Sequence, residues 1–258
     1  MNAAVAAPRA ELIEIFSAIQ GEGTIIGRRQ IFVRFGRCDV KCVYCDTPLC
    51  HTTLSHFRVE TEAGKRTFER RENPVGTDEI SAFIARLDRK PGLHHSVSFT
   101  GGEPLLHHEA IVALAPSIRA RGMAVYLETN GHLVGELERA MAAVDIVGMD
   151  IKLPSTAGFA ERFAENERFL AAAIAARKEA FVKIVVGAAT TFDEIDGAAQ
   201  AVRRAAPATY VCLQPVTPFG GVGTPPTPER LLELHERALE TLKNVVVIPQ
   251  THKMLRQL

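Results

Sequence analysis

The sequence shows no excess of either charge and no hydrophobic segment long enough to cross a membrane. Lys plus Arg and Asp plus Glu both total 30 among 258 residues, so the formal net charge is zero. We therefore expect no binding of nucleic acid or of an anionic membrane through overall charge. No run of 18 apolar residues occurs, and this argues against a transmembrane helix.

A secretory signal is also missing. The N-terminal stretch MNAAVAAPRA has no positive segment followed by a long apolar core, and we interpret residues 1–10 as a disordered lead-in. Cysteines number only five, and three of them lie within eight positions. Clustered cysteines without a signal are typical of a reducing cytoplasm, where thiolates bind metals or catalyse reactions. We therefore expect a cytoplasmic protein.

No Pro/Ser-rich linker divides the chain, which favours a single domain over residues 1–258. Short β-branched runs predict strands at 31–35, 96–100, 124–128, 145–150, 181–186, 210–214 and 245–249. Amphipathic patterns between them predict helices at 77–89 (with Thr77 as N-cap), 107–121, 164–180, 193–206 and 228–242. This alternation predicts an α/β fold with a mainly parallel sheet and helical crossovers. The polar segment 48–76 interrupts it and is interpreted as an inserted hairpin or loop.

The unusual residues follow the predicted strands at their carboxyl ends. GRCDVKC follows 31–35, GGEP follows 96–100, TNG follows 124–128, IK follows 145–150, PVTPFG follows 210–214 and QTHK follows 245–249. In a parallel barrel or a doubly wound sheet, these ends share one face, which carries the active site. Elsewhere, Cys212 is predicted to lie in the core, and His94, His95, His107 and His108 are predicted to face solvent.

Cys38, Cys42 and Cys45 have the spacing C-x3-C-x2-C. The spacing is too tight, and the number odd, for a disulfide framework. A zinc site would need Cys50 or His51 as a fourth ligand. An iron–sulfur cubane bound by three cysteines would keep one iron open for another ligand.

The segment TGGEP, residues 100–104, decides between these interpretations. Its adjacent glycines allow a ligand close to the backbone, and Glu103 offers a carboxylate to an ammonium group. Together with the cysteine spacing and the tyrosine before Cys45, it resembles the radical S-adenosylmethionine (SAM) enzymes. The resemblance implies a [4Fe–4S] cluster on Cys38, Cys42 and Cys45, with its open iron bound by SAM.

Within that superfamily, the chain resembles the 7-carboxy-7-deazaguanine synthases from residue 11 to its end, apart from 48–76. The resemblance is carried by FSAIQGEG (16–23), FVRFGRC (32–38), YCDT (44–47), TGGEP (100–104), ETNG (128–131), LQPV (213–216) and PQTHK (249–253). It implies a partial (β/α) barrel and a carbon–nitrogen lyase of 7-deazapurine (queuosine) biosynthesis. The implied reaction converts 6-carboxy-5,6,7,8-tetrahydropterin into 7-carboxy-7-deazaguanine and ammonia by radical ring contraction. The implied cofactors are the cluster, SAM and Mg²⁺.

The resemblance also implies site residues and partners. The SAM contacts would be Tyr44, Cys45, Asp46, Gly102, Glu103, Asp150, Ile151, Lys152, Gln214, Pro215, Val216 and Thr217. The pterin contacts would be Ile19, Gln20, Gly21, Glu22, Arg34, Thr100, His252 and Leu258, and Thr47 would bind Mg²⁺. The expected partners are the pterin, an electron donor such as flavodoxin or ferredoxin, and a second copy in a homodimer.

We expect no side chain to act as a general acid or base, because the cofactors carry the radical chemistry. The main alternative is an activase of a glycyl radical enzyme, which would act on a protein. A non-catalytic zinc- or iron–sulfur-binding regulatory module is a third possibility.

Overall fold

The computed structural model of the chain describes residues 7–218, 221 and 224–258, and its centre is a ten-stranded sheet. The strand order is β12-β11-β10-β9-β8-β7-β3-β2-β4-β5. The strands are β2 (Leu12–Ile19), β3 (Arg29–Phe35), β4 (His56–Glu60), β5 (Phe68–Glu72), β7 (Ser96–Gly101), β8 (Ala124–Thr129), β9 (Ile146–Ile151), β10 (Glu179–Val186), β11 (Tyr210–Pro215) and β12 (Val245–Val247). From β12 to β3 every neighbouring pair is parallel.

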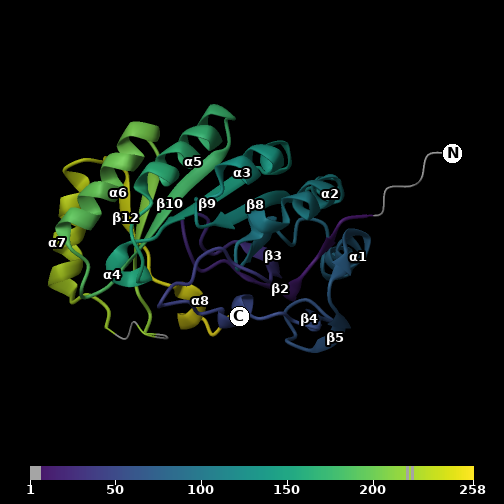
Figure 1. The fold of residues 1–258 in the computed structure, drawn as a ribbon. Coiled ribbons are helices and arrows are strands. Elements are labelled where there is room, and N and C mark those ends of the chain that lie inside the picture. Colours follow the sequence, from purple (N-terminus) through teal and green to yellow (C-terminus); the bar gives the residue numbers. More distant parts are fainter. Residues whose placement is uncertain (1–6, 219–220, 222–223) are drawn as a thin grey trace.

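The longer helices connect these parallel strands and cover one side of the sheet. They are α1 (Thr77–Leu87), α2 (His108–Arg119), α3 (Val134–Ala140), α5 (Phe163–Ala175), α6 (Phe192–Ala205) and α7 (Pro228–Leu239). Figure 1 shows α2, α3, α5 and α6 following one another along that side. The sheet ends at β12 and β5, so it remains open. The α/β class and the mainly parallel sheet are confirmed, in the form of a partial barrel.

Shorter elements lie between the main ones. They are the helices α4 (Pro154–Ala157) and α8 (Thr251–Met254), the 3-10 helices η1 (Pro48–His51), η2 (Pro104–His107) and η3 (Met141–Ala143), and the short strands β1 (Arg9–Ala10) and β6 (Val75–Gly76). None of the helices in the described residues has the length and hydrophobicity needed to cross a membrane.

The parallel strands form because both of their faces are buried. All six residues of β9 are buried, as are the first five of β7, and such two-sided burial explains their continuous apolar sequences. Helix α6 starts with a capping box between Thr191 and Glu194, which satisfies N–H groups that the first helical turn leaves free. Cys212 is fully buried beside Tyr126 and Phe181, so its predicted core position is confirmed.

Several local predictions were wrong. The apolar strand β2 was not predicted, although it pairs with β3 on one side and β4 on the other. Arg9 and Ala10 pair with β6, so the expected disordered lead-in cannot extend to residue 10; residues 1–6 lie outside the described part. Thr77 is the first residue of α1, Gly76 is the N-cap, and no side chain caps the helix.

The histidines predicted to face solvent are largely covered. His94 is 3 % exposed and lies between Asp88 and Ser17, with 2.9 Å from a ring nitrogen to each oxygen. His107 stacks on Phe35. Their polar neighbours allow these imidazoles to be buried, because a hydrogen-bonded polar group loses little on leaving water.

The segment 48–76 contains an antiparallel hairpin of β4 and β5. Strand β4 also pairs with β2, so the hairpin extends the main sheet. Phe57 and Val59 point from β4 into the core, where both are buried. Arg58, which lies between them, forms an ion pair with Glu14.

Candidate active site

A cavity opens at the carboxyl ends of the central strands. Most of the predicted site residues line it: Ile19, Gln20, Gly21, Glu22, Arg34, Cys38, Cys42, Tyr44, Cys45, Asp46, Thr47, Thr100, Gly102, Asp150, Lys152, Gln214, Val216, Thr217, His252 and Leu258. The fold therefore brings together segments from nearly the whole length of the chain. Glu103, Ile151 and Pro215 do not line the cavity.

The three motif cysteines lie on the loop that follows β3. Cys38, Cys42 and Cys45 are free and partly exposed towards the cavity. Asn130 fixes this loop to the end of β8, because its Nδ2 donates to Asp39 Oδ1 at 2.7 Å. A loop with three converging free thiols can provide soft ligands for an iron–sulfur cluster.

A fourth thiol, that of Cys50, lies beside them. It is 3 % exposed, and its proximity is the main cause that lowers the pKa of the Cys38 and Cys45 thiols, that of Cys45 to about 6. A lower pKa favours the thiolate, which is the form that binds metals. The sulfurs of Cys45 and Cys50 and a ring nitrogen of His51 lie within 4.8 Å of one another. Geometry alone thus leaves the zinc interpretation open.

A second group of side chains surrounds Asp150, at the end of β9. Lys152 Nζ contacts Asp150 Oδ2 at 2.7 Å and donates to the Tyr44 hydroxyl at 2.8 Å. The other carboxylate oxygen, Asp150 Oδ1, is buried and has no hydrogen-bond partner among the residues that the structure describes, and the same holds for Gln214 Oε1. Buried acceptors without partners are costly, so both oxygens are ready to accept hydrogen bonds from a ligand.

The Gly-Gly-Glu segment after β7 serves two purposes. A Cβ on Gly102 would lie 1.7 Å from the Arg37 carbonyl oxygen, so only glycine fits where this backbone passes the cysteine loop. Glu103 is fully buried, and its carboxylate accepts from Asn130 N, Leu105 N and Thr129 Oγ1 at 2.9–3.1 Å. Glu103 does not line the cavity in this structure, and its contact with a ligand ammonium stays a prediction. Its carboxyl group holds the ends of β7 and β8 together.

Glu22 occupies the other end of the cavity. Lys183 Nζ lies 2.5 Å from Glu22 Oε2, and Gln250 Nε2 donates to Glu22 Oε1 at 2.7 Å. Burial alone would raise the pKa of Glu22, but Lys183 and these hydrogen bonds outweigh it and lower the pKa to about 2. Glu22 is therefore a carboxylate at any physiological pH.

Gln20, which was predicted to contact the pterin, forms several hydrogen bonds within the protein. Its amide donates to Gln30 Oε1 at 2.9 Å and to Glu128 Oε1 at 2.6 Å, and it accepts from the Glu22 backbone N–H at 3.0 Å. Thr100 Oγ1 donates to the second Glu128 oxygen at 2.8 Å. Gln20 thus holds the turn that presents Glu22.

Arg34 and Thr47 meet at the cavity wall. Arg34 Nε donates to Glu14 Oε1 at 2.9 Å, and its Nη1 donates to the Thr47 hydroxyl at 3.3 Å. That hydroxyl lies 3.3 Å from Asp46 Oδ1 and does not cap η1. The Thr47 oxygen therefore faces other polar side chains, beside the cysteine loop.

The C-terminal segment closes the cavity from one side. Thr251 N donates to the Gly21 carbonyl at 3.0 Å, and a Cβ on Gly21 would lie only 2.4 Å from His252 N and Nδ1. Leu258 packs against the cluster of Phe16, Ala18 and Phe32. Burial lowers the pKa of His252, which favours a neutral imidazole at the cavity.

Comparisons with known proteins identify the family. A model of the radical SAM superfamily matches residues 32–206. The chain is 43 % identical to the 7-carboxy-7-deazaguanine synthase of Geobacter sulfurreducens, over 97 % of this chain and 99 % of that protein. The chain belongs to the 7-carboxy-7-deazaguanine synthase family. The synthase of Methanocaldococcus jannaschii is 35 % identical, over 95 % of this chain and 99 % of its own length.

The fold comparison agrees with this family. The structure of QueE from Escherichia coli superposes with a TM-score of 0.58 at 19 % identity and covers 93 % of each chain. The predicted resemblance is thus confirmed, and the chain is a radical SAM enzyme. Its family uses a [4Fe–4S] cluster and SAM, and QueE is also Mg²⁺-dependent.

The residues present fit these cofactors. Three free thiols on one loop suit a cluster that keeps one iron open. The unpartnered acceptors Asp150 Oδ1 and Gln214 Oε1 suit the amino group and hydroxyls of SAM, all of which can donate. Family membership favours an iron–sulfur cluster over the zinc site that Cys45, Cys50 and His51 could form.

Sequence reasoning missed several polar residues of the cavity, among them Glu128, Lys183 and Gln250. Glu128 and Gln250 stand inside quoted motifs, ETNG and PQTHK, but were given no role. The signal for Lys183 is a lone charge within the apolar strand FVKIVV. A lysine is almost never buried in such a strand unless it is paired.

Proposed function

We propose that this chain converts 6-carboxy-5,6,7,8-tetrahydropterin into 7-carboxy-7-deazaguanine and ammonia. The observation that carries the proposal is a single cavity with three free cysteines, two unpartnered buried acceptors and a permanently charged Glu22. The first two features suit the cluster and SAM, and the third suits the aminopyrimidine edge of a pterin. Family membership supports the same reaction.

SAM would be held by the residues around Asp150. The lining residues assigned to it are Tyr44, Cys45, Asp46, Gly102, Asp150, Lys152, Gln214, Val216 and Thr217. When bound, the cluster and SAM would supply the radical chemistry that removes a hydrogen atom from C6 of the substrate. The protein positions both ligands and excludes water, and Lys152 keeps Asp150 in place through its 2.7 Å contact.

The pterin would lie between Glu22 and Arg34. Ile19, Gln20, Gly21, Thr100, His252 and Leu258 complete this part of the cavity wall. The Glu22 carboxylate can accept N–H bonds from the 2-amino pyrimidine edge. Arg34 has more N–H donors than its contacts with Glu14 and Thr47 use, and a planar guanidinium suits the substrate carboxylate.

Mg²⁺ would be bound by Thr47 together with oxygens of the substrate. Magnesium prefers oxygen ligands and keeps several waters, so one threonine hydroxyl is sufficient as an anchor when the substrate supplies the rest. The nearby Asp46 oxygen, 3.3 Å from the hydroxyl, adds negative charge to this position.

The remaining expectations follow from the family. We infer a cytoplasmic homodimer that receives electrons from a flavodoxin or ferredoxin. Five free cysteines are described, which suits a reducing compartment. The test of dimerisation is the mass in solution of the cluster-loaded protein.

The function itself is tested by mass spectrometry. Cluster-loaded protein is incubated anaerobically with the carboxytetrahydropterin, SAM, Mg²⁺ and dithionite, and 7-carboxy-7-deazaguanine is expected as the product. An activase would instead cleave SAM productively only with a protein partner. SAM cleavage without any change in the pterin would contradict the proposal.

A further inference from the structure

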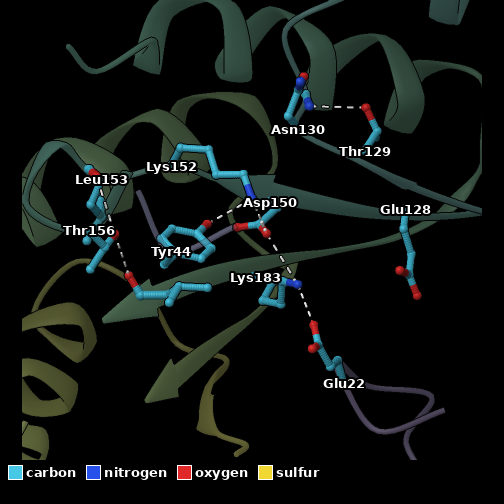
Figure 2. Close-up of polar contacts among 12 residues, drawn as sticks. Glu22, Tyr44, Glu128, Thr129, Asn130, Asp150, Lys152, Leu153, Thr156 and Lys183 are labelled. Carbon is cyan, nitrogen blue, oxygen red and sulfur yellow. Dashed lines mark hydrogen bonds and ion pairs between the residues drawn. The ribbon is translucent and has the colours of Figure 1, made fainter. Parts of the chain in front are cut away.

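Lys183 lies between the two proposed binding positions and belongs to neither of them. It is the only lysine of β10, with Asp150 of β9 and Cys212 of β11 as its partners in register. Its Nζ lies 2.5 Å from Glu22 Oε2 and 3.2 Å from Asp150 Oδ2. Figure 2 shows the resulting chain of contacts from Glu22 through Lys183 and Asp150 to Lys152 and Tyr44.

We propose that Lys183 is a positioning residue that couples substrate binding at Glu22 to SAM binding at Asp150. This inference rests on the proposed function. Glu22 and Asp150 come from segments far apart in sequence. Among the described residues, Lys183 is the side chain that forms ion pairs with both of them. A change at one carboxylate therefore acts on the other through a single ammonium group.

The direction of coupling follows from the hydrogen-bond capacity of the groups. In the structure, the ammonium is closer to Glu22 than to Asp150, by 2.5 Å against 3.2 Å. When N–H groups of a pterin donate to Glu22, they share its negative charge and weaken its hold on Lys183. Lys183 then shifts towards Asp150 Oδ2 and fixes that carboxylate with its unpartnered Oδ1 ready for SAM. Substrate should thus tighten SAM binding and, because coupling is reciprocal, SAM should tighten substrate binding.

The charge balance gives a second consequence. Glu22 and Asp150 carry two negative charges, and Lys183 and Lys152 carry two positive ones, with all four side chains less than 20 % exposed. Glu22 also faces His252 on α8 and Tyr126 on β8, and Glu128 on β8 faces Lys183. None of these three groups supplies a permanent positive charge. Burial raises the pKa of Glu22, whereas Lys183 is the strongest influence that lowers it. Without Lys183 this pKa therefore rises above its wild-type value, and the carboxylate is protonated at a higher pH than in wild type.

The test measures binding, not turnover. The Kd of SAM is determined by equilibrium dialysis on anaerobic, unreduced, cluster-loaded protein, with and without the carboxytetrahydropterin. Wild type should bind SAM at least about fivefold more tightly with substrate present, within the usual range of coupling. Lys183→Met should lose this difference to within about twofold, whereas Lys183→Arg, which keeps the charge, should retain part of it. Lys243→Met, which changes an exposed lysine between α7 and β12, is the matched control and should behave as wild type.

A pH series separates this role from a merely structural one. From pH 8.5 down to pH 5.5, the ratio of substrate Kd between Lys183→Met and wild type should rise, because only the variant loses the Glu22 carboxylate. If Lys183→Met fails to fold, as judged by circular dichroism, Lys183→Gln provides the same test, since it removes the charge but keeps a polar side chain and should also lose the coupling.

The outcomes distinguish the two proposals. Wild type that does not bind the pterin would refute the proposed substrate, and the coupling with it. Wild type that binds the pterin and shows coupling, together with a Lys183→Met variant that keeps the coupling and has a flat pH ratio, would overturn the role of Lys183 alone. Wild type that binds both ligands independently would do the same.

Discussion

Replacing Gly21 by alanine should displace the C-terminal segment from the cavity. The new Cβ would lie 2.4 Å from His252 N and Nδ1, whereas ordinary contact begins at 3.4 Å. His252 and its backbone must therefore move by about 1 Å, and overpacking of this kind costs about 1–3 kcal/mol. Release of the segment would instead break the Thr251–Gly21 bond and the Gln250–Glu22 bond, a loss of about 2–4 kcal/mol in total.

Displacement of His252 and release of the C-terminal segment should both lower the stability of the protein. A loss of about 2–3 kcal/mol corresponds to a fall in Tm of roughly 4–12 °C for a domain of this size. Circular dichroism measures the Tm, and limited proteolysis measures release of the C-terminal segment. Gly135→Ala is the control, since nothing lies within 4 Å of its added Cβ in α3, and it should be neutral or slightly stabilising. If Gly21→Ala matched Gly135→Ala in both Tm and proteolysis, the close approach of His252 to residue 21 would be refuted.

Further predictions concern the metals and one buried acid. Alanine variants of Cys38, Cys42 and Cys45 should not bind the cluster, whereas Cys50→Ala should keep it. Iron content and the visible absorption of the cluster are measured after anaerobic reconstitution, and loss of iron in Cys50→Ala would indicate a four-cysteine site. Mg²⁺ should stimulate wild-type turnover. Thr47→Ala should lose most of this stimulation, and Thr47→Ser should keep much of it because the hydroxyl remains. An unchanged response to Mg²⁺ in Thr47→Ala would exclude Thr47 as a ligand of the ion. Burial raises the pKa of Glu103 from 4.5 to about 8, so the folded state binds this proton more tightly than the unfolded state does. As the pH rises from about 5 to 9, wild type should therefore lose stability relative to Glu103→Gln. Parallel Tm–pH curves for these two proteins would contradict that shift.

Much of the site could be predicted because parallel strands place their carboxyl ends on one face. Each motif that follows a predicted strand has residues at the cavity, including Cys38 after β3, Asp150 at the end of β9 and Gln214 at the end of β11. The period of the strands and the order of the crossovers determine this arrangement. It does not depend on the details of side-chain packing.

The missed features depend on contacts between distant segments. Strand β2 has no alternation, because residues on both of its faces are buried. Its mostly apolar run could not be distinguished from a helical segment by period. The role of Glu103 depends on Thr129 and Asn130, which lie on the next strand and its loop. A motif shows that a carboxylate is present, but the fold decides whether that carboxylate faces a ligand or the protein.

The buried charges of the cavity show the same principle. Taking ions out of water costs several kcal/mol each, and apolar residues of similar volume often stabilise a fold as well as a buried ion pair does. The series Glu22, Lys183, Asp150 and Lys152 is thus a poor device for stability, although every member has an oppositely charged neighbour. This arrangement fixes the orientation of both carboxylates, because each has one oxygen held by an ammonium group. Within the described part of the chain, the second oxygen of Glu22 is bonded by Gln250 alone, and that of Asp150 has no partner. In the proposed function, a pterin and SAM must be held in fixed relative positions, and carboxylates fixed in this way can do so. The sequence feature that indicates the arrangement is the lysine within an apolar strand, Lys183.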